Sequence, residues 1–535
     1  MNKQLSEHKM FFPQYRKGKL GVELFEGTIL EHAQKLGVAI DAECDGDGSC
    51  GKCVVRIERG QEALSPRTEA EQKFNLDSSQ RLACQAKVVK PADIYVYIKS
   101  AGSYSILSDT VRHELEIDPL VRCIDGQVVW SGPPGQRVLG PCQGAMYGLA
   151  LDVGTTTLVC QLLDLETGQQ VATLARKNPQ AAYGDDVISR IDYTMRHEHG
   201  LEELQAVVIA AANGIIQEFT GQVGVRPETI YEAVVVGNPT MRNLFFGLEV
   251  KSLGVIPFEP PSKEPVNVTA ATLGLQINPE ANVYGAALIG GHAGADCLAD
   301  IIAARLHEAD KPCLLIDIGT NGEVAVGNAN GIMTASCAAG GAYEGATVGS
   351  GVGAVEGAIS NIRIDDGQVQ YKTIGDKAPV GICGSGLIDL LAELLRTGIM
   401  TKKAKLSEDF TITDSICFTQ QDVYQLITAK AGLRVDQDLL LKYYGVTPEQ
   451  LDKIYLAGAF GNYIQVGSAV AIGLLPDAEE KIIKIGNAAL AGAAEMLLSR
   501  RIRQDSEVWA ARIEHTKPNE REPEFQYMVA DNMYF

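Results

Sequence analysis

The sequence predicts a mixed α/β and α+β protein of several domains, in which a small N-terminal domain precedes a larger body of two duplicated lobes. Its 535 residues are enough for two to four domains at about 100–200 residues each. Four cysteines are grouped within the first 100 residues, and one short Asp-x-Gly-Thr sequence occurs twice further along. We therefore expect an N-terminal domain over 1–100, a linker or reduced middle domain over 101–146, and the two-lobed body over 147–535.

The composition is that of a globular chain, because 46% of the residues are hydrophobic, 21% are charged and the mean hydropathy is 0.00. No run reaches the ~18 uncharged apolar residues of a membrane span. Residues 1–12 also lack the apolar core of a signal peptide. The sequence thus predicts a cytoplasmic protein with no membrane partner.

The charge is unevenly distributed. The net charge of −20 repels phosphate backbones and anionic surfaces, so we expect no nucleic-acid partner. Residues 1–100 hold 15 basic and 14 acidic side chains, so the acidic excess lies in residues 101–535. The N-terminal domain is therefore predicted to be nearly neutral and the body acidic.

The twelve cysteines are too few for a disulfide scaffold in a chain of this length, and we expect their thiols to stay reduced. Eight of them are scattered, mostly within apolar stretches, which is typical of cysteines buried as small hydrophobic side chains. These eight are Cys123, Cys142, Cys160, Cys297, Cys313, Cys337, Cys383 and Cys417. The other four are grouped in a spacing that is typical of cysteines that bind a metal centre.

The N-terminal domain is expected to place strands and turns around one helix. Residues 19–27 alternate like a strand that runs into a turn, and Thr28 and Glu31 have the capping-box pattern of a helix that ends at Gly37. Further strands are predicted at 54–60 and 93–99. The grouped cysteines lie on the loops between these elements.

The grouped cysteines, Cys44, Cys50, Cys53 and Cys84, have the spacing C-x5-C-x2-C-x30-C. Three thiolates on one loop and a fourth from a distant strand suit a 2Fe-2S cluster, because four sulfurs must converge on two irons. Glycines in the same loop let it wrap closely and direct backbone N–H groups toward sulfur. A zinc site of four cysteines is the alternative, although such a site usually has two C-x2-C hairpins and this sequence has one.

This pattern resembles the 2Fe-2S ferredoxins of β-grasp fold, and the five-residue first gap is nearest to their adrenodoxin-like branch. The resemblance covers about residues 15–100 and implies that the four cysteines bind one 2Fe-2S cluster. The acidic residues Asp41, Glu43, Asp45 and Asp47 either dock a basic electron donor or are simply solvated.

The body begins near Gly148 with a strand, a small polar turn and two further strands, and the same pattern recurs from Cys313. The matched residues, 165 positions apart, are Asp152 with Asp317, Gly154 with Gly319, and Thr155 with Thr320. A glycine turn brings N–H groups and hydroxyls close to phosphate oxygens, while an aspartate at its start holds hydrated Mg²⁺. One such turn is typical of an ordinary hairpin, but two at matching positions predict two lobes facing one phosphate site.

This architecture resembles the superfamily of actin, sugar kinases and heat-shock chaperones (ASKHA), in which two RNase H-like domains close around ATP. The resemblance implies that Asp152 and Asp317 serve Mg²⁺. The expected phosphate-binding residues are Gly154, Thr155, Thr156, Gly319, Thr320, Asn321 and Gly322.

Further segments occur in the order that this superfamily shows. Asp296 opens a helix over 295–306, where it either binds Mg²⁺ and orients water or simply interacts with the helix dipole. The turn Gly384-Ser385-Gly386 runs into a helix and is expected to lie against the nucleotide. The expected adenosine-binding residues are Gly458, Gly461 and Asn462, and residues 486–492 resemble the second connecting helix.

Several longer strings are more specific, and they are similar to reductive activators of corrinoid-dependent enzymes. They are 178–191, 234–241, 336–346, 381–389 and 456–464. The resemblance implies that ATP and a one-electron step return a Co(II) corrinoid to Co(I). It implies a corrinoid protein as partner and an electron donor such as a reduced ferredoxin or a flavoprotein, and it leaves a homodimer open. Residues 101–146 are either a flexible connection or short structured packing against the body.

Two alternatives remain open on the sequence alone. One is a kinase of the sugar kinase type fused to a ferredoxin, which would need a catalytic aspartate in a carbohydrate cleft. The other is an electron carrier whose body binds nucleotide only for regulation. ATP hydrolysis stimulated by a corrinoid protein separates the activator from both alternatives.

Overall fold

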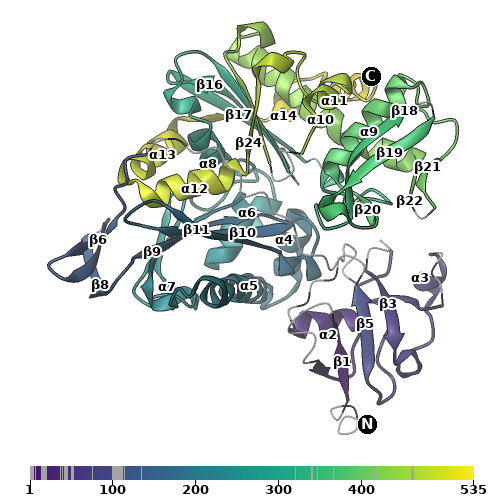
Figure 1. Cartoon of the computed structure of the whole chain (residues 1–535), viewed down its shortest axis with the longest axis horizontal. Coiled ribbons are helices and arrows are strands. Elements are labelled where there is room, and N and C mark those ends of the chain that lie inside the picture. Colours follow the sequence, from purple (N-terminus) through teal and green to yellow (C-terminus); the bar gives the residue numbers. More distant parts are fainter. Residues whose placement is uncertain are drawn as a thin grey trace.

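The computed structural model describes every residue of the chain except 1–4, 6–7, 14–20, 37, 39, 41–45, 50–52, 75, 77, 99–112, 114, 134, 320, 339–340, 346, 366, 415 and 459–462. In Figure 1 a small head, formed by residues before 99, lies beside a larger body of two lobes. Within the described residues, no helix is long and apolar enough to cross a membrane.

The head is a five-stranded mixed sheet in the order β2-β1-β5-β3-β4 with one main helix. Its strands are β1 (Lys9–Phe11), β2 (Val22–Glu23), β3 (Val54–Arg59), β4 (Gln80–Leu82) and β5 (Ile94–Ile98), and its helices are α2 (Ile29–Leu36) and α3 (Glu69–Gln72). The predicted capping box starts α2, since Thr28 N donates to Glu31 Oε2 at 2.5 Å and Glu31 N donates to Thr28 Oγ1 at 3.2 Å. This is the expected β-grasp arrangement.

A three-stranded antiparallel sheet follows, made of β6 (Val121–Ile124), β7 (Gln127–Gly132) and β8 (Gly135–Pro141). Its apolar side chains join a core cluster of the body, and buried Trp130 donates to Glu232 Oε1 at 3.0 Å. These residues therefore pack against the first lobe. The sheet lies at the end of the body that is away from the head (Figure 1).

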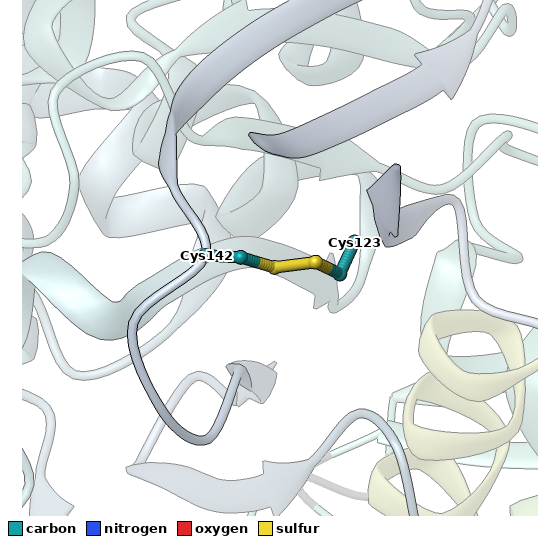
Figure 2. The surroundings of a disulfide bond; sticks show 2 residues. All are labelled: Cys123 and Cys142. Atoms are coloured by element: carbon teal, nitrogen blue, oxygen red, sulfur yellow. A yellow bond between two sulfur atoms is a disulfide. The ribbon is translucent and has the colours of Figure 1, made fainter. Parts of the chain in front are cut away.

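The expectation that all scattered cysteines are buried and reduced was wrong for part of the set. Cys123 and Cys142 form a disulfide between β6 and the residue that follows β8 (Figure 2). The antiparallel meander brings these two positions together, which their spacing in the sequence did not show. Cys417 is exposed and Cys337 is half-buried, whereas the remaining four are buried.

The first lobe contains a six-stranded sheet in the order β11-β10-β9-β12-β14-β13. Its strands are β9 (Tyr147–Val153), β10 (Thr157–Asp164), β11 (Gln170–Lys177), β12 (Ile230–Val236), β13 (Val266–Thr269) and β14 (Asn282–Gly285). Its helices are η2 (Pro179–Ala182), α4 (Val187–Arg196), α5 (Gly200–Val223), α6 (Pro239–Phe246) and α7 (Ala270–Leu273).

The second lobe repeats this sheet, with the order β24-β23-β15-β16-β17-β25. Its strands are β15 (Cys313–Ile318), β16 (Asn321–Asn328), β17 (Gly331–Ala338), β23 (Ile454–Ala457), β24 (Ile482–Gly486) and β25 (Glu514–His515). In each lobe an antiparallel three-strand meander is followed by two parallel strands on the side of its first strand. The predicted duplication is confirmed.

Two connecting helices, α8 (Ala295–Ala303) and α12 (Ala488–Leu498), lie between the lobes. They cross so closely that a Cβ atom at Gly492 would lie 2.1 Å from the Ala299 carbonyl oxygen. This contact requires glycine at position 492 and holds the two helices closely against each other.

The second lobe also carries a subdomain, visible at the right of the body in Figure 1. It contains β18 (Ala358–Asp365), β19 (Gln368–Thr373), β20 (Gly381–Ile382), β21 (Phe410–Thr413), β22 (Ile416–Phe418) and α9 (Gly384–Arg396). The remaining helices are α10 (Gln420–Tyr444), α11 (Val466–Ala471), α13 (Arg500–Arg512), α14 (Pro518–Arg521) and α15 (Phe525–Asn532).

Candidate functional site

Two of the four predicted cluster cysteines meet inside the head. Cys53 precedes β3 and Cys84 follows β4, and the antiparallel pairing of Val54 with Leu82 places them side by side. Their Sγ atoms are 3.2 Å apart, and the two residues are buried. Cys44 and Cys50 lie outside the described residues.

The paired sulfurs fit a metal centre. Two thiolates bound to one tetrahedral ion at about 2.3 Å have their sulfurs just under 4 Å apart. The observed sulfurs, 3.2 Å apart, lie somewhat closer together than that and are not joined in a disulfide. This geometry suits iron and zinc equally, so it does not by itself decide between the predicted cluster and the zinc alternative.

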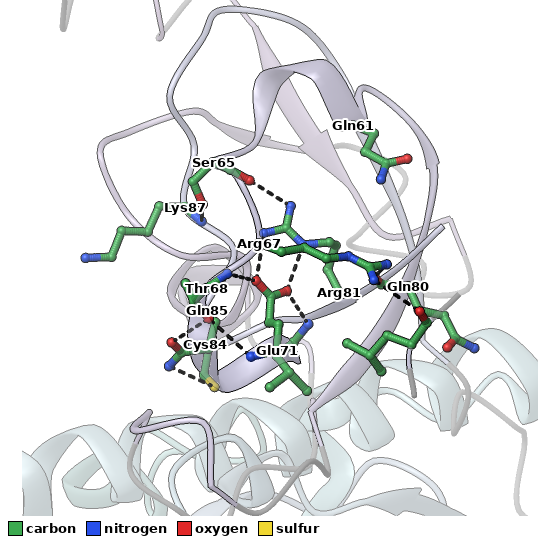
Figure 3. A network of polar contacts seen from close by, with 12 residues as sticks. Gln61, Ser65, Arg67, Thr68, Glu71, Gln80, Arg81, Cys84, Gln85 and Lys87 are labelled. Atoms are coloured by element: carbon green, nitrogen blue, oxygen red, sulfur yellow. Dashed lines mark hydrogen bonds and ion pairs between the residues drawn. The ribbon is translucent and has the colours of Figure 1, made fainter. Parts of the chain in front are cut away.

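A buried ion pair supports the turn that carries Cys84 (Figure 3). Glu71 is fully buried and accepts hydrogen bonds from Arg81 at 2.7 and 3.0 Å, and from the backbone N–H groups of Thr68 at 2.9 Å and Leu82 at 3.1 Å. Burial raises the pKa of Glu71, but these hydrogen bonds outweigh burial and hold the pKa below its ordinary value. The pair anchors the chain two residues before Cys84.

The two Asp-x-Gly-Thr turns form the hairpins at which each meander begins. Asp152 is the last residue but one of β9, and Gly154 N donates to Thr157 O at 3.0 Å across the first turn. Asp317 lies in β15, and Gly319 N donates to Asn321 O at 3.2 Å across the second. Thr320 lies outside the described residues.

The connecting helices bring further polar groups to these turns. Asn487, which caps α12, donates to Asp152 Oδ2 at 2.9 Å, and Asp296 in the first turn of α8 accepts from Cys297 N at 2.8 Å. Sequence reasoning missed Asn487. It also missed Asp300, a fully buried carboxyl one helical turn after Asp296, which the i, i+4 spacing on one helix could have indicated.

The carboxyl groups between the lobes are strongly perturbed. Burial raises the pKa of Asp152 to about 6, although Asn487 opposes the shift. Burial raises the pKa of Asp296 to about 7, and the charges of Asp152 and Asp317 add to this effect. Burial, together with the charges of Asp317 and Asp296, also raises the pKa of Asp300 well above its ordinary value. Such a cluster of desolvated acids is typical of a functional site.

These carboxyl groups do not make a complete metal site by themselves. Among the residues that the structure describes, no three histidine, cysteine, aspartate or glutamate side chains are placed to hold one ion. A Mg²⁺ ion here would need phosphate oxygens and water for its other ligands, which is how Mg²⁺ commonly binds at nucleotide sites.

Three polar side chains fix the first Asp-x-Gly-Thr turn, and sequence reasoning did not assign them. Arg190 donates to Thr155 O at 2.7 Å and to Gly184 O at 2.8 Å. Asn178 donates to Gly154 O at 2.9 Å, and Asn238 donates to Thr155 Oγ1 at 3.0 Å. Asn178 and Asn238 each cap a helix that starts with proline, and this Asn-Pro pattern was the available signal.

The head contacts the body next to Asn178 and Arg190, the residues that hold the first Asp-x-Gly-Thr turn. Gln34 of α2 donates to Ala182 O at 2.8 Å, and Ala182 ends η2, the short helix that Asn178 caps. Burial lowers the pKa of Arg190 to about 10, with Asp185 and Asp186 opposing the shift, so its guanidinium stays charged at neutral pH. The segment 178–190 therefore contacts the first Asp-x-Gly-Thr turn on one side and the head on the other.

The remaining predicted residues occupy the second lobe. The Ser385 hydroxyl donates to Ser360 O at 2.8 Å, and a Cβ at Gly386 would lie 2.3 Å from Ile359 O, so both residues pack α9 onto β18. Gly458 has φ +115°, and a Cβ there would lie 2.9 Å from Asp317 Oδ1. Glycine at 458 thus allows the end of β23 to approach the second turn. Gly461 and Asn462 lie outside the described residues.

Three protein-family models match the chain. Residues 19–89 match the "2Fe-2S iron-sulfur cluster binding domain", residues 147–309 the "RACo middle region", and residues 311–535 the "C-terminal domain of RACo the ASKHA domain". The class is therefore a ferredoxin domain fused to an ASKHA ATPase domain, and the head holds a 2Fe-2S cluster.

Similar proteins narrow this class further. The "Corrinoid activation enzyme RamQ" of Eubacterium limosum is 30% identical over 555 aligned residues, which cover 89% of this chain and 91% of the relative. The "[Co(II) methylated amine-specific corrinoid protein] reductase" of Methanosarcina barkeri is 27% identical, over 66% of this chain and 70% of its own. A solved "Reductive activator for corrinoid,iron-sulfur protein" aligns with TM-score 0.74 and 29% identity, over 99% of this chain and 98% of its own. The chain belongs to the family of corrinoid activation enzymes.

Proposed function

We propose that this protein is an ATP-dependent reductive activase that returns a partner's Co(II) corrinoid to Co(I) by transferring one electron from its 2Fe-2S cluster. One observation carries the proposal: a single chain joins the sulfur pair of Cys53 and Cys84 to a body with duplicated Asp-x-Gly-Thr turns. The family membership supports both halves.

The reduction potentials explain why both the cluster-bearing head and the ATP-binding body are needed. Plant-type 2Fe-2S centres have potentials near about −400 mV, and each ~59 mV that a one-electron step runs uphill costs tenfold in equilibrium. The Co(II)/Co(I) couple is expected to lie lower than the cluster, so unaided transfer would stall. A body that binds the corrinoid protein differently with and without ATP shifts that equilibrium in favour of reduction.

The cluster would be held by Cys44, Cys50, Cys53 and Cys84, and it supplies a one-electron carrier. Cys53 and Cys84, at the ends of neighbouring strands, are suited to bind the same iron. Glu71 and Arg81 hold the chain two residues before Cys84, which is itself buried.

The nucleotide would lie between the lobes. Asp152, Asp317 and Asp296 would act on Mg²⁺ through water, with Asn487 orienting Asp152. The phosphate groups would be bound by Gly154, Thr155, Thr156, Gly319, Thr320, Asn321 and Gly322, and the adenosine by Gly458, Gly461 and Asn462. Because the Ser385 hydroxyl is used by Ser360 O, residues 384–386 would contribute backbone N–H groups at the start of α9.

The partners follow from this division of labour. The body would bind the corrinoid protein, and a low-potential donor such as a reduced ferredoxin or a flavoprotein would reload the head. A homodimer is compatible with this scheme but is not required by it.

The test is an anaerobic absorbance assay of a Co(II) corrinoid protein, with a reductant of modest potential, in the presence and absence of ATP. We expect Co(I) to accumulate only with ATP. Cys53→Ala should stop cobalt reduction and leave ATP hydrolysis intact, whereas Asp317→Ala should stop hydrolysis and leave cluster reduction intact. Equal formation of Co(I) with and without ATP would leave only a nucleotide-binding ferredoxin.

A further inference from the structure

Gln85 directly follows the proposed cluster ligand Cys84, and its side chain lies against residues 46–48. A Cβ atom at Gly48 would be 3.0 Å from Gln85 Cδ and 3.1 Å from its Cγ. Figure 3 shows Gln85 beside Cys84 and Thr68. The glutamine thus fills the space between the loop at 46–49 and the turn after β4.

The orientation of the Gln85 amide is fixed by its partners. Gln85 Nε2 donates to Gly46 O at 2.6 Å, and Gln85 Oε1 accepts from Thr68 Oγ1 at 3.2 Å. A carbonyl oxygen only accepts, so the nitrogen must face Gly46. The second N–H of the same amide then points toward Cys84 Sγ, at an N–S distance of 3.7 Å.

Thr68 is itself held in place, which makes the orientation of the amide stable. Its backbone N–H donates to Glu71 Oε2 at 2.9 Å, and its hydroxyl accepts from Glu71 N at 3.3 Å. This is a complete capping box at the start of α3. The buried Glu71–Arg81 pair therefore positions Thr68, and Thr68 positions the amide of Gln85.

We propose that Gln85 is a positioning residue that sets the reduction potential of the cluster, by holding residues 46–48 against Cys84 and donating a hydrogen bond to Cys84 Sγ. The inference rests on the proposed cluster at these cysteines. A donor to a ligating sulfur stabilises the additional negative charge that reduction brings, so it favours the reduced form.

The redox step is a transfer of one electron from a low-potential donor to the cluster. The donor is oxidised by one electron, the cluster is reduced by one electron, and no covalent bond or proton is exchanged. Gln85 makes this loading step more favourable and makes the cluster a weaker reductant toward cobalt. The unfavourable step is then the electron transfer from the cluster to cobalt, which is the step that depends on ATP.

Gln85 also lies on the side of the head that faces the body. With Gly46, Thr68 and Cys84 it lines a cavity of about 1450 Å³, whose opposite wall includes Tyr183 and Tyr193. Cys84 also lines this cavity, but the residue is only 6% exposed, so little water screens the contact between its sulfur and the Gln85 amide.

The experiment is an anaerobic redox titration of the full-length protein, in which electron paramagnetic resonance follows the reduced cluster. Gln85→Leu should lower the equilibrium constant for reduction about tenfold, which is a midpoint about 59 mV more negative for one electron. Thr68→Val, which frees the amide to rotate, should shift the midpoint in the same direction by a smaller amount. Gln61→Leu is the matched control, because it removes a glutamine bond to Ser78 O elsewhere in the head, and its midpoint should equal that of the wild type.

An unchanged midpoint in Gln85→Leu, with the visible spectrum of the cluster intact, would overturn the inference and leave the proposed function standing. If Gln85→Leu fails to retain its cluster, Thr68→Val decides: a more negative midpoint supports the role of Gln85, and the wild-type midpoint refutes it. A wild-type protein with zinc in place of a one-electron cluster would refute both this inference and the proposed function.

Discussion

The buried ion pair of the head allows a quantitative prediction, because Glu71→Gln keeps the shape of the side chain but removes its charge. Glu71 is fully buried, and only 3% of the Arg81 side chain is exposed. The substitution would leave the Arg81 guanidinium uncompensated, with Ser65 O, at 3.0 Å, as one of its remaining acceptors. Removing one partner of a buried pair costs roughly 3–5 kcal/mol.

For a domain of about 60–100 residues, 1 kcal/mol shifts the melting temperature by about 4–8 °C. We therefore expect Glu71→Gln to lower the midpoint of head unfolding by at least roughly 12 °C, the product of the lower ends of these two ranges. The assay is loss of visible cluster absorbance during anaerobic heating, since the network holds the backbone of Leu82, two residues before Cys84.

The matched control is the double variant Glu71→Met with Arg81→Met. Replacing both members of a buried pair by apolar side chains of similar volume is often neutral or stabilising, so the double variant should melt closer to the wild type than Glu71→Gln does. The reasoning is refuted if the single variant melts within about 4 °C of the wild type, which corresponds to a loss of no more than roughly 1 kcal/mol.

Three further predictions concern the pH dependence of head stability, ATP hydrolysis and the first Asp-x-Gly-Thr turn. The pKa of Glu71 is lower in the folded head than its ordinary value of 4.5, so ionised Glu71 stabilises the head above about pH 4.5, and this stability is lost as the pH falls through the folded pKa. The melting temperature of Glu71→Gln should therefore fall less steeply with acid than that of the wild type. Parallel plots of melting temperature against pH would contradict this sign. Asp152→Ala and Asp317→Ala should each abolish ATP hydrolysis, measured as phosphate release, while the visible spectrum of the cluster is unchanged. Normal hydrolysis in both variants would reject the placement of the nucleotide between the two turns. Arg190→Met removes charged hydrogen bonds to the Thr155 and Gly184 carbonyls, and one such bond is worth about 1.5–3 kcal/mol. Calorimetry should therefore show that the variant binds ATP roughly 10-fold more weakly than the wild type, or weaker still. Arg176→Met, at an exposed arginine, is the control, and equal affinities of Arg190→Met and the wild type would contradict the argument.

The sequence by itself determined the architecture, because its strongest signals are local. The capping box at Thr28 predicted α2, and the alternating residues 54–60 and 93–99 predicted β3 and β5. The two Asp-x-Gly-Thr turns predicted the duplication, since a hairpin with this turn needs only a few neighbouring residues to form. The cysteine spacing likewise predicted the sulfur pair of Cys53 and Cys84, because both cysteines flank strands that pair directly.

Only the tertiary structure decided which side chains support these turns. Asn487 reaches Asp152 from 335 positions away, because α12 begins between the lobes. Arg190 reaches Thr155 because η2 and α4 fold back beneath the first turn. The disulfide of Cys123 with Cys142 depends on how the β6–β8 meander closes. The residues around Arg190, Asn487 and the two cysteines do not reveal these partners, because each contact depends on how strands and helices pack after the chain has folded.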